Sequence, residues 1–326
     1  MKLGIDIREY ALKKPFRITG HVFDSSRVVE VSLTDTNGVV GRGETSGAYY
    51  LGESAESMAQ QCEDIAASIT ASTTRADIQN LLPPCGARNA VDCAFWDLEA
   101  KQTGQSVWHL TGIDPKPLTT VFTIGIEESS QKMADNARAA ADFPVLKIKM
   151  DGDQPAERMQ AIRVARPDAD IVVDANQGWT FEQLVEVAPE FANLGVAMIE
   201  QPLPRGSDQA LEGFESPVVL CADESCLHLG EIEEVAKRYQ MINIKLDKSG
   251  GLTEGLAMAE EAMKRGLQLM VGNMMGSSLA MAPGTVIAQL CRFVDLDGPL
   301  LLKKDRAPAL GYEGSTVHPT GTSLWG

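Results

Sequence analysis

The chain reads VLKIKM at 145–150, DIVVDAN at 170–176, VAMIEQP at 196–202 and VVLCADE at 218–224. Each run has strand length, is rich in β-branched and other apolar residues, and carries charged or amide side chains toward its end, which indicates a buried β-strand. Four more runs share this texture: TTVFTIG (119–125), MINIKLD (241–247), LQLMVGN (267–273) and RFVDLDG (292–298). The sequence therefore predicts eight strands.

From the second strand onward, the strand centres follow one another at intervals of 22 to 26 residues. Helical patterns such as ERMQAIRVAR, TFEQLVEVAPEFANL and LTEGLAMAEEAMKRG fill the gaps. A repeat of one strand plus one helix is typical of a parallel sheet, and eight such strands favour a (β/α)₈-type barrel, which we expect over residues 119–302.

Residues 1–118 have a different, α+β texture. The segment VVEVSLTDTNGVVGRGE (28–44) alternates around a Thr-Asn-Gly turn and predicts a hairpin, and helical patterns follow near 54–68 and 87–102. The tail, 303–326, contains no further strand-helix unit. We expect it to pack back on residues 1–118.

Composition narrows the class of protein. With 29 Lys and Arg against 45 Asp and Glu, the formal net charge is −16, which disfavours nucleic acid and anionic membranes as main partners. A 44% hydrophobic fraction argues for a folded protein, and neither a membrane span nor a secretory signal is predicted. The six cysteines form no CxxC pair, so we expect free thiols and a cytoplasmic location. Assembly into a homo-oligomer stays open.

Polar residues mark the ends of seven of the eight strands. In a barrel these carboxyl ends meet at one mouth, where chemistry is carried out. One such residue alone would most often be a solvated strand end, but seven in succession point to a site. They are Lys147 and Lys149, Asp174 and Asn176, Glu200, Asp223 and Glu224, Lys245, Asn273, and Asp295 and Asp297.

Three carboxylates, Asp174, Glu200 and Asp223, end three successive strands. Mg²⁺ prefers a few oxygen ligands in octahedral geometry, and without a cation three converging anions would repel one another. Zinc is disfavoured because no His or Cys lies at a matching strand end except Cys221. The pattern therefore predicts a magnesium site.

Lys149 and Lys245 flank the three carboxylate strands, so we expect their amines to face each other across the mouth. Nearby cations would lower their pKa values and make them suitable bases. The alternative is that both lysines only form ion pairs with the carboxylates.

The segments KIKM, DANQGW, IEQPLP, CADES and NIKLDKSGGL resemble the muconate-lactonizing-enzyme subgroup of the enolase superfamily over nearly the whole chain. Within it, DLDGP at the eighth strand is similar to the dipeptide epimerases, in particular those acting on L-Ala-D/L-Glu. The resemblance implies an α/β fold, a modified TIM barrel (β/α)₇β, with an α+β N-terminal capping domain that the chain's tail completes.

The resemblance also implies roles for the residues at the strand ends. Asp174, Glu200 and Asp223 would hold Mg²⁺, Lys149 and Lys245 would be the acid/base pair, and Lys147 would offset the charge of the substrate carboxylate. Asp295 and Asp297 would hold the ammonium of a dipeptide. Asn176 and Glu224 would orient the ligands and a lysine.

Two segments would set specificity. RITGHVFDSSR (17–27) corresponds to a mobile cap loop, in which members acting on Glu carry an arginine at a place that falls here near His21 or Phe23. Arg17 and Arg27 are alternative sources of that charge. TSGAYYLGES (45–54) would close the pocket with Tyr49, unless its tyrosines are ordinary loop aromatics. The similarity favours Glu as the second residue and leaves a more apolar one open.

The resulting hypothesis is a Mg²⁺-dependent dipeptide epimerase that inverts the C-terminal residue's α-carbon by a two-base 1,1-proton transfer through an enediolate. The alternatives are a cycloisomerase or an o-succinylbenzoate synthase, and, from another class, a non-catalytic amino-acid- or peptide-binding protein. An acidic pair at the eighth strand suits a substrate ammonium and disfavours acidic substrates without one. Asn273 replaces the histidine that a sugar-acid dehydratase would carry at the seventh strand.

Overall fold

In the computed structural model, which describes residues 1–326, the first three strands form one antiparallel sheet. They are β1 (Lys2–Ile18), β2 (His21–Thr34) and β3 (Val40–Thr45). The turn between β2 and β3 is closed by the Asp35 carboxylate, which accepts the backbone N–H groups of Asn37 and Val39. Gly38 takes the left-handed conformation there, with φ +84°. The predicted hairpin over 28–44 is confirmed.

A helical layer covers this sheet. It comprises η1 (Tyr49–Leu51), α1 (Ala55–Ile65), η2 (Ala66–Ser68), α2 (Arg75–Leu81), α3 (Gly86–Thr103) and α4 (Val107–Thr111). Ser54 and Thr74 begin α1 and α2 with capping boxes, which satisfy N–H groups at the two helix starts. The long helix α3 lies directly on β3, where Gly41 and Gly43 let the two backbones approach closely. We call β1–β3 with these helices the cap.

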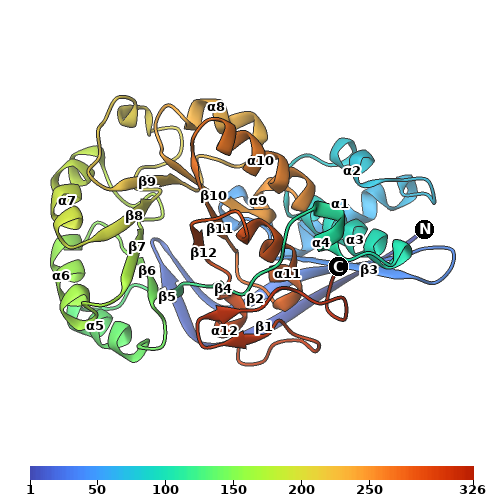
Figure 1. Ribbon diagram of the computed structural model, residues 1–326, viewed down its shortest axis with the longest axis horizontal. Coiled ribbons are helices and arrows are strands. Elements are labelled where there is room, and N and C mark those ends of the chain that lie inside the picture. Colours follow the sequence, from blue (N-terminus) through green and yellow to red (C-terminus); the bar gives the residue numbers. More distant parts are fainter.

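Eight parallel strands form the second sheet, in which each strand pairs with its neighbours in chain order. The backbone N–H of Val121 donates to Val294 O at 2.8 Å and links the two ends of the curled sheet. The eight strands and the cap confirm the predicted fold (Figure 1). The strands are β5 (Phe122–Ile124), β6 (Val145–Lys149), β7 (Asp170–Asp174), β8 (Val196–Glu200), β9 (Val219–Ala222), β10 (Met241–Lys245), β11 (Gln268–Gly272) and β12 (Phe293–Val294).

Helices connect most of these strands on the outside of the barrel: α5 (Ser130–Ala139), α6 (Pro155–Ala165), α7 (Phe181–Asn193), α8 (Ile232–Val235), α9 (Leu246–Ser249), α10 (Leu252–Lys264) and α11 (Ser278–Ala288). The three stretches quoted as helical lie in α6, α7 and α10. Between β8 and β9, however, the repeat lacks an α-helix and has only η3 (Gln209–Leu211). Prolines 202, 204 and 217 and two glycines with positive φ make that connection a poor helix.

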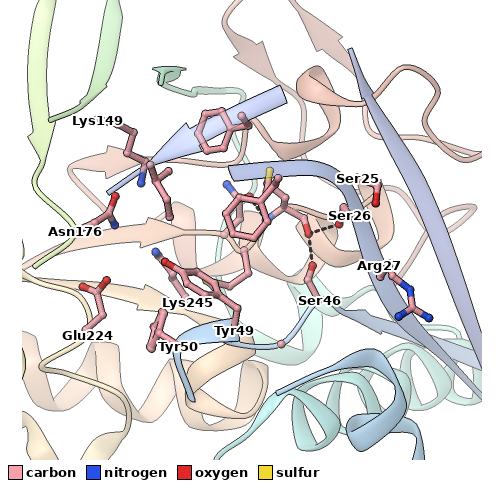
Figure 2. Close-up of a pocket in the computed structure, with 17 residues that line it drawn as sticks. Ser25, Ser26, Arg27, Ser46, Tyr49, Tyr50, Lys149, Asn176, Glu224 and Lys245 are labelled. Atoms are coloured by element: carbon pink, nitrogen blue, oxygen red, sulfur yellow. Dashed lines mark hydrogen bonds between the residues drawn. The ribbon is translucent and has the colours of Figure 1, made fainter. Parts of the chain in front are cut away.

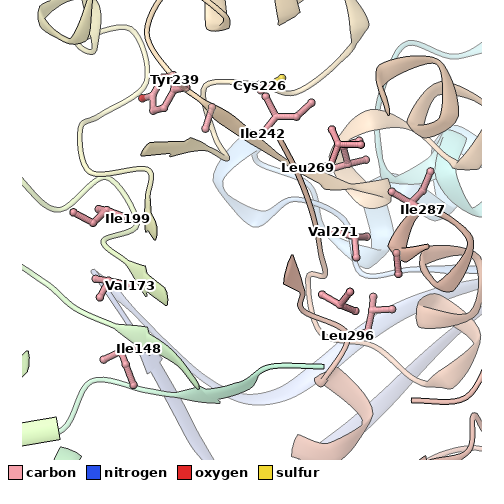
Figure 3. Packing of buried hydrophobic residues seen from close by; sticks show 14 of the residues in the cluster. Ile148, Val173, Ile199, Cys226, Tyr239, Ile242, Leu269, Val271, Ile287 and Leu296 are labelled. Carbon is pink, nitrogen blue, oxygen red and sulfur yellow. The ribbon is translucent and has the colours of Figure 1, made fainter. Parts of the chain in front are cut away.

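Residue alternation along the strands gives the barrel two apolar layers. Inside, one residue from each of six strands joins Val121 in a cluster: Val172, Met198, Cys221, Met241, Met270 and Phe293. Outside, the residues next to them in the chain, such as Val173 and Ile199, pack in the large core beneath the helices (Figure 3). Side chains two positions beyond the inner layer therefore point to the barrel mouth.

The tail contacts the beginning of the chain at several points. β13 (Tyr312–Glu313) and β14 (Thr316–Val317) pair with β4 (Leu118–Thr119), while α12 (Gly298–Leu301) leads into the tail. Trp325 Nε1 donates to Cys93 O at 2.9 Å, and the Gly326 N–H donates to Asp97 Oδ1 at 2.8 Å, so the tail packs on α3. The domain boundaries at 118/119 and 302/303 stay a prediction.

All six cysteines are free thiols, five of them buried, which agrees with the absence of a disulfide framework. None of the helices combines the length and the apolar character that a membrane crossing requires.

The contact between β3 and α3 gives a stability prediction. A Cβ atom at Gly43 would lie 2.0 Å from Ala90 O, a clash with backbone that cannot move away easily. Gly43→Ala should lower the free energy of unfolding by about 1–3 kcal/mol, the usual cost of overpacking. The control is Gly321→Ala, because a Cβ atom at Gly321 would meet no other atom within 4 Å. Equal melting temperatures for the two variants in calorimetry would contradict this interpretation.

Candidate active site

The barrel mouth holds the polar side chains that end the strands. Asp174, Glu200 and Asp223 each follow an inner-layer residue by two positions, and Lys147, Lys245 and Asp295 have the same parity on their own strands. All six are buried. The alternation of the strands thus brings together residues that are up to 148 positions apart.

Lys147 lies at the centre of this group. Its Nζ is 2.7 Å from Glu200 Oε2, 2.8 Å from Asp295 Oδ2 and 3.1 Å from Asp174 Oδ2, and the side chain is 1% exposed. Burial alone would lower the pKa of Lys147, but the three carboxylates raise it well above its usual value. Lys147 therefore stays protonated and neutralises part of the negative charge around it.

Lys149 and Lys245 approach the mouth from opposite sides. They end β6 and β10, which are four strands apart in a sheet of eight and therefore halfway around the barrel. Lys149 Nζ donates to Asp174 Oδ2, and Lys245 Nζ donates to Asp223 Oδ2, both at 2.6 Å. Both lysines line one cavity between the mouth and the cap (Figure 2).

In the protein without a metal ion the pKa of Lys245 is raised, so the expected lowering, which counted the metal among the nearby cations, stays a prediction. Burial would lower its pKa, but the carboxylate of Asp223 at 2.6 Å, with Glu200 and Asp174 further away, outweighs burial and raises it. The ion pairs that the sequence offered as the alternative are present, at 2.6 Å for both lysines.

The three predicted metal ligands all lie at the mouth. In this arrangement, however, no three His, Cys, Asp or Glu side chains converge closely enough to hold a metal ion. Asp174 and Asp223 are turned toward lysines, and Glu200 Oε1 accepts from Asn243 Nδ2 at 2.7 Å. Lysine charges outweigh burial and lower the pKa of Asp174 to about 2.

The chemistry of these donors nevertheless fits a hard divalent cation. Glu200 Oε2 is buried and accepts no hydrogen bond of acceptable geometry, although Lys147 Nζ lies 2.7 Å away. Burial and the charge of Asp174 raise the pKa of Glu200, so positive charge placed here would stabilise its ionised form. Three carboxylates from successive strands make up an all-oxygen set of the kind Mg²⁺ prefers.

Asn176 and Glu224 line the cavity beside the carboxylates. The backbone N–H of Asn176 donates to Asp174 Oδ1 at 2.9 Å, whereas its side-chain Oδ1 is buried without a partner. Glu224 Oε2 is likewise buried without a donor, and burial, followed by the charges of Asp223 and Asp174, raises the pKa of Glu224 to about 8. No hydrogen bond joins Glu224 to a lysine, so its predicted role in orienting one is not seen here. Asn176 Oδ1 and Glu224 Oε2 are both acceptors without a donor, on residues that line the cavity.

Asp295 and Asp297 are at the mouth but do not line the cavity. Asp295 bonds to Lys147 and to Asn273 Nδ2, and Asp297 Oδ2 accepts the backbone N–H of Thr123 at 2.7 Å. Burial and the charge of Asp295 raise the pKa of Asp297 to about 7. A cation beside this pair would be stabilised.

The segment 17–27, expected as a loop, forms the end of the β1–β2 hairpin with its turn at Thr19 and Gly20, and its mobility stays a prediction. In Figure 1 the hairpin reaches from the cap to the barrel beside β5 and β6. Arg17 O accepts the N–H of Ile126, and Thr19 Oγ1 donates to Ala175 O, both at 3.1 Å. The hairpin thus bonds to two separate loops of the mouth.

Aromatic rings form the cap's side of the cavity. The ring of His21 lies 5.0 Å from Phe23 and 4.7 Å from Tyr49, and Tyr49 lies 5.3 Å from both Phe23 and Tyr50. Phe23, Tyr49 and Tyr50 line the cavity, whereas His21 is exposed and lines a neighbouring hollow. The structure therefore brings both expected specificity segments together.

Hydrogen bonds hold the cap on the barrel around residues 273–277. Ser26 and Ser46, from two cap segments, both donate to Met275 O, and Glu44 Oε1 accepts the N–H of Ser277 at 2.7 Å. Asp247, two residues after Lys245, accepts from Thr45 Oγ1 at 2.7 Å. These contacts fix the loop that carries Tyr49 and Tyr50 relative to the lysines.

Several residues at the site were absent from the prediction. Lys248 Nζ donates to Asp223 Oδ1 at 2.6 Å, and Asn243 bonds to Glu200. Asn243 shares the parity of Lys245 and could have been found from the alternation. Lys248 lies in the short helix α9, for which strand periodicity gives no signal.

Comparison with known proteins adds family information to this geometry. Residues 3–112 match the family model of the mandelate racemase / muconate lactonizing enzyme N-terminal domain, and residues 131–297 match the enolase C-terminal domain-like model. The chain is 42% identical over 312 residues to L-Ala-D/L-Glu epimerase of Escherichia coli, covering 95% of this chain and 97% of that protein. It is 42% identical over 259 residues to N-acetyl-D-glutamate racemase of a Pseudoalteromonas species, covering 79% and 82%.

Solved structures share the fold. An Agrobacterium tumefaciens enolase family member with homology to dipeptide epimerases, with bound sodium and L-Ala-L-Glu, superposes with a TM-score of 0.96 at 41% identity over 99% of both chains. A dipeptide epimerase from Methylococcus capsulatus, complexed with Mg and L-Arg-D-Lys, has a TM-score of 0.88 at 26% identity over 100% of both. The chain therefore belongs to the enolase superfamily, in its mandelate racemase and muconate lactonizing enzyme group, and is an isomerase of the racemase and epimerase type.

Proposed function

We propose that this protein is a Mg²⁺-dependent dipeptide epimerase that inverts the α-carbon of the C-terminal residue, with L-Ala-D/L-Glu or a related dipeptide as substrate. The observation that carries the proposal is the placement of Lys149 and Lys245 halfway around the barrel from each other, lining one cavity. Inversion by proton transfer needs a base on one face of the carbon and an acid on the other. A protein that only binds peptides has no need of this arrangement.

Asp174, Glu200 and Asp223 would hold the cation through their carboxylate oxygens. The buried Glu200 Oε2, which is paired with Lys147 but accepts no hydrogen bond of acceptable geometry, supports this assignment. When bound, Mg²⁺ supplies positive charge that offsets the three carboxylates, lowers the pKa values of the nearby lysines, and stabilises the negative charge that develops on the substrate carboxylate.

The chain's own residues then account for the proton transfer. One of the two lysines, in its neutral form, takes the α-proton, and the electron pair of the C–H bond delocalises into the substrate carboxylate as an enediolate. The protonated Lys147 contributes fixed positive charge at the mouth, where this negative charge develops. The opposite lysine, as an ammonium, returns a proton to the other face, and the configuration inverts.

Asp295 and Asp297 are the residues proposed to hold the dipeptide's ammonium group. Their buried carboxylates, with the pKa of Asp297 raised by burial and by its neighbour, favour an added cation. A cycloisomerase or o-succinylbenzoate synthase acts on an acidic substrate without an ammonium, and so does a racemase of N-acylated amino acids. The acidic pair favours the dipeptide over these alternatives.

The two lysines give the first functional prediction. Lys149→Met and Lys245→Met should each lower kcat for epimerisation at least ~10³-fold, within the range of general acid–base catalysis. The measurement is polarimetry together with deuterium uptake at the α-carbon in D₂O. Lys132→Met, at an exposed position of α5, is the control. Retained turnover in either site variant would show that the bases are misassigned.

The metal site gives a second prediction. Treatment with a chelator should abolish α-proton exchange, and Mg²⁺ should restore it. Because a ligand that binds only the folded state stabilises it, Mg²⁺ at 100 times its Kd should add about 2.7 kcal/mol to the free energy of unfolding. Asp223→Asn should lose this stabilisation. Full exchange by protein shown by elemental analysis to be metal-free would contradict the proposal.

The acidic pair gives a third prediction. Asp297→Asn removes the charge but keeps an acceptor for the Thr123 N–H, which limits damage to the fold. It should lower kcat/KM for dipeptides by roughly 10- to 100-fold, the loss expected for one charge-assisted hydrogen bond. N-succinyl and N-acetyl amino acids, tested in parallel, should not lose activity. Equal losses for both substrate classes would remove the argument for an ammonium site.

A further inference from the structure

Gln201, the residue that follows Glu200 at the end of β8, has a strained backbone. It is 0% exposed and has φ +37°. Residues other than glycine seldom adopt positive φ, and such conformations persist mainly at functional sites, where the surrounding contacts hold them. A glycine would occupy this position without strain. The contacts made by the side chain of Gln201 therefore have to outweigh the strain.

The backbone of Gln201 links three strand ends. Its N–H donates to Cys221 O, and its carbonyl oxygen accepts the N–H of Gln177, both at 2.8 Å. Cys221 lies two residues before Asp223 on the next strand, and Gln177 lies three residues after Asp174, beyond the end of the preceding strand. The three strands that carry the predicted metal ligands are therefore joined at one residue.

The side-chain oxygen of Gln201 holds the backbone at Asp223. Oε1 accepts the N–H groups of Asp223 and Ser225, both at 2.9 Å. The strand β9 ends at Ala222, so Asp223 lies just beyond it, and its N–H is bonded by this amide and not by the sheet. Gln201 thereby continues the bonding between β8 and β9 up to the residue that carries the carboxylate.

The side-chain nitrogen of Gln201 fixes the other end of the amide. Nε2 donates to Leu203 O and Ser225 Oγ, both at 2.8 Å, and to Tyr239 OH at 3.1 Å. The Tyr239 hydroxyl in turn donates to Asp208 Oδ2 at 2.9 Å, and its ring lies in the large core outside the barrel (Figure 3). Because both ends of the amide are bonded, it has one orientation, and a buried network of this kind rigidifies its surroundings.

The bonds from lysines to Asp223 differ from the bond to Gln201. Lys245 and Lys248 donate to the two carboxylate oxygens, the atoms that a cation would take, and Lys248 bonds to the carbonyl oxygen as well. The bonds to the carboxylate have to rearrange when a metal binds. The N–H of Asp223 is no metal ligand, so its bond to Gln201 can persist with and without the metal. Gln201 therefore fixes the backbone from which this carboxylate projects, whichever partner the carboxylate has.

We propose that Gln201 is a positioning residue for the cation: its amide holds the backbones of Glu200 and Asp223 in one relative placement, and this makes the site select Mg²⁺ over Ca²⁺. The inference rests on the proposed function, in which these carboxylates hold the metal. Mg²⁺ requires near-ideal octahedral geometry, whereas the larger Ca²⁺ tolerates varied ligand numbers and flexible geometry. Loosening the two carboxylates relative to each other should therefore weaken the binding of Mg²⁺ more than that of Ca²⁺.

The test is a calorimetric titration of the full, chelator-treated chain with Mg²⁺ and, separately, with Ca²⁺. Gln201→Met keeps the length of the side chain and removes its hydrogen bonds. It should weaken Mg²⁺ binding by about 10- to 100-fold, the usual effect of losing a contact behind a metal ligand. The affinity for Ca²⁺ should fall less, so the ratio of the two affinities should decrease. A purely structural role would lower the melting temperature and leave this ratio unchanged.

Tyr239→Phe is the matched control, because it removes one bond from the same amide and leaves the bonds to Asp223 and Ser225 in place. It should lower the melting temperature and leave both metal affinities unchanged. If Gln201→Met does not fold, Gln201→Gly is titrated in its place, because it removes the same side-chain bonds in a residue that adopts positive φ without strain.

The outcomes separate this inference from the proposed function. Equal losses of affinity for the two cations, or the same affinity ratio in Gln201→Met and Tyr239→Phe, would overturn the role of Gln201 and leave the epimerase proposal intact. Failure of the unaltered chain to bind Mg²⁺ would overturn both.

Discussion

Lys147 lies within 3.1 Å of three carboxylates and is 1% exposed, and a charge buried this deeply is stable only if its surroundings balance it. Around it the mouth buries six carboxylates and four lysines, a balance of 4 − 6 = −2 if all ionise. The lysines are Lys147, Lys149, Lys245 and Lys248, and the carboxylates are Asp174, Glu200, Asp223, Glu224, Asp295 and Asp297. The remaining negative charge makes the mouth receptive to cations, and the barrel and cap provide the rigid frame that holds these groups together.

Much of this frame could be predicted from the sequence because strand alternation is a local property. A run such as DIVVDAN shows directly that Val172 and Asp174 share a face, and the regular spacing of the runs places each such pair on the next strand. The eight strands, the hairpin over 28–44 and the residues of the mouth follow from that pattern. The helix expected between β8 and β9 is missing because the prolines and glycines of that connection oppose helix formation. These residues were visible in the sequence, but the regular spacing of the strands was given more weight in the prediction.

Other features depend on contacts between distant segments and could not be predicted. The bond from Lys248 to Asp223 arises because α9 turns back over the end of β9, and the bonds from Ser26 and Ser46 to Met275 join the cap to a loop more than 200 residues later. The raised pKa of Lys245 has the same origin, since it depends on the 2.6 Å contact with Asp223 rather than on the residue types present. The end of the β1–β2 hairpin was expected as a loop. It keeps its strand conformation because β1 and β2 pair with each other and bond to loops of the barrel, and these contacts are not visible in the local sequence.

The attachment of the cap to Met275 also bears on how the protein is made. The cap strands leave the ribosome early, whereas the carbonyl that receives Ser26 and Ser46 is synthesised 249 and 229 residues later. Domains generally fold in order during synthesis, and contacts between distant residues form slowly because the loop between them must first be closed. The early hairpin therefore cannot form its bonds to Met275 until the seventh strand of the barrel has been synthesised. Until then its apolar Phe16, Ile18 and Phe23 are not covered by the barrel. The surface that lines the cavity in the finished protein is therefore left uncovered by the barrel for most of the synthesis of the chain.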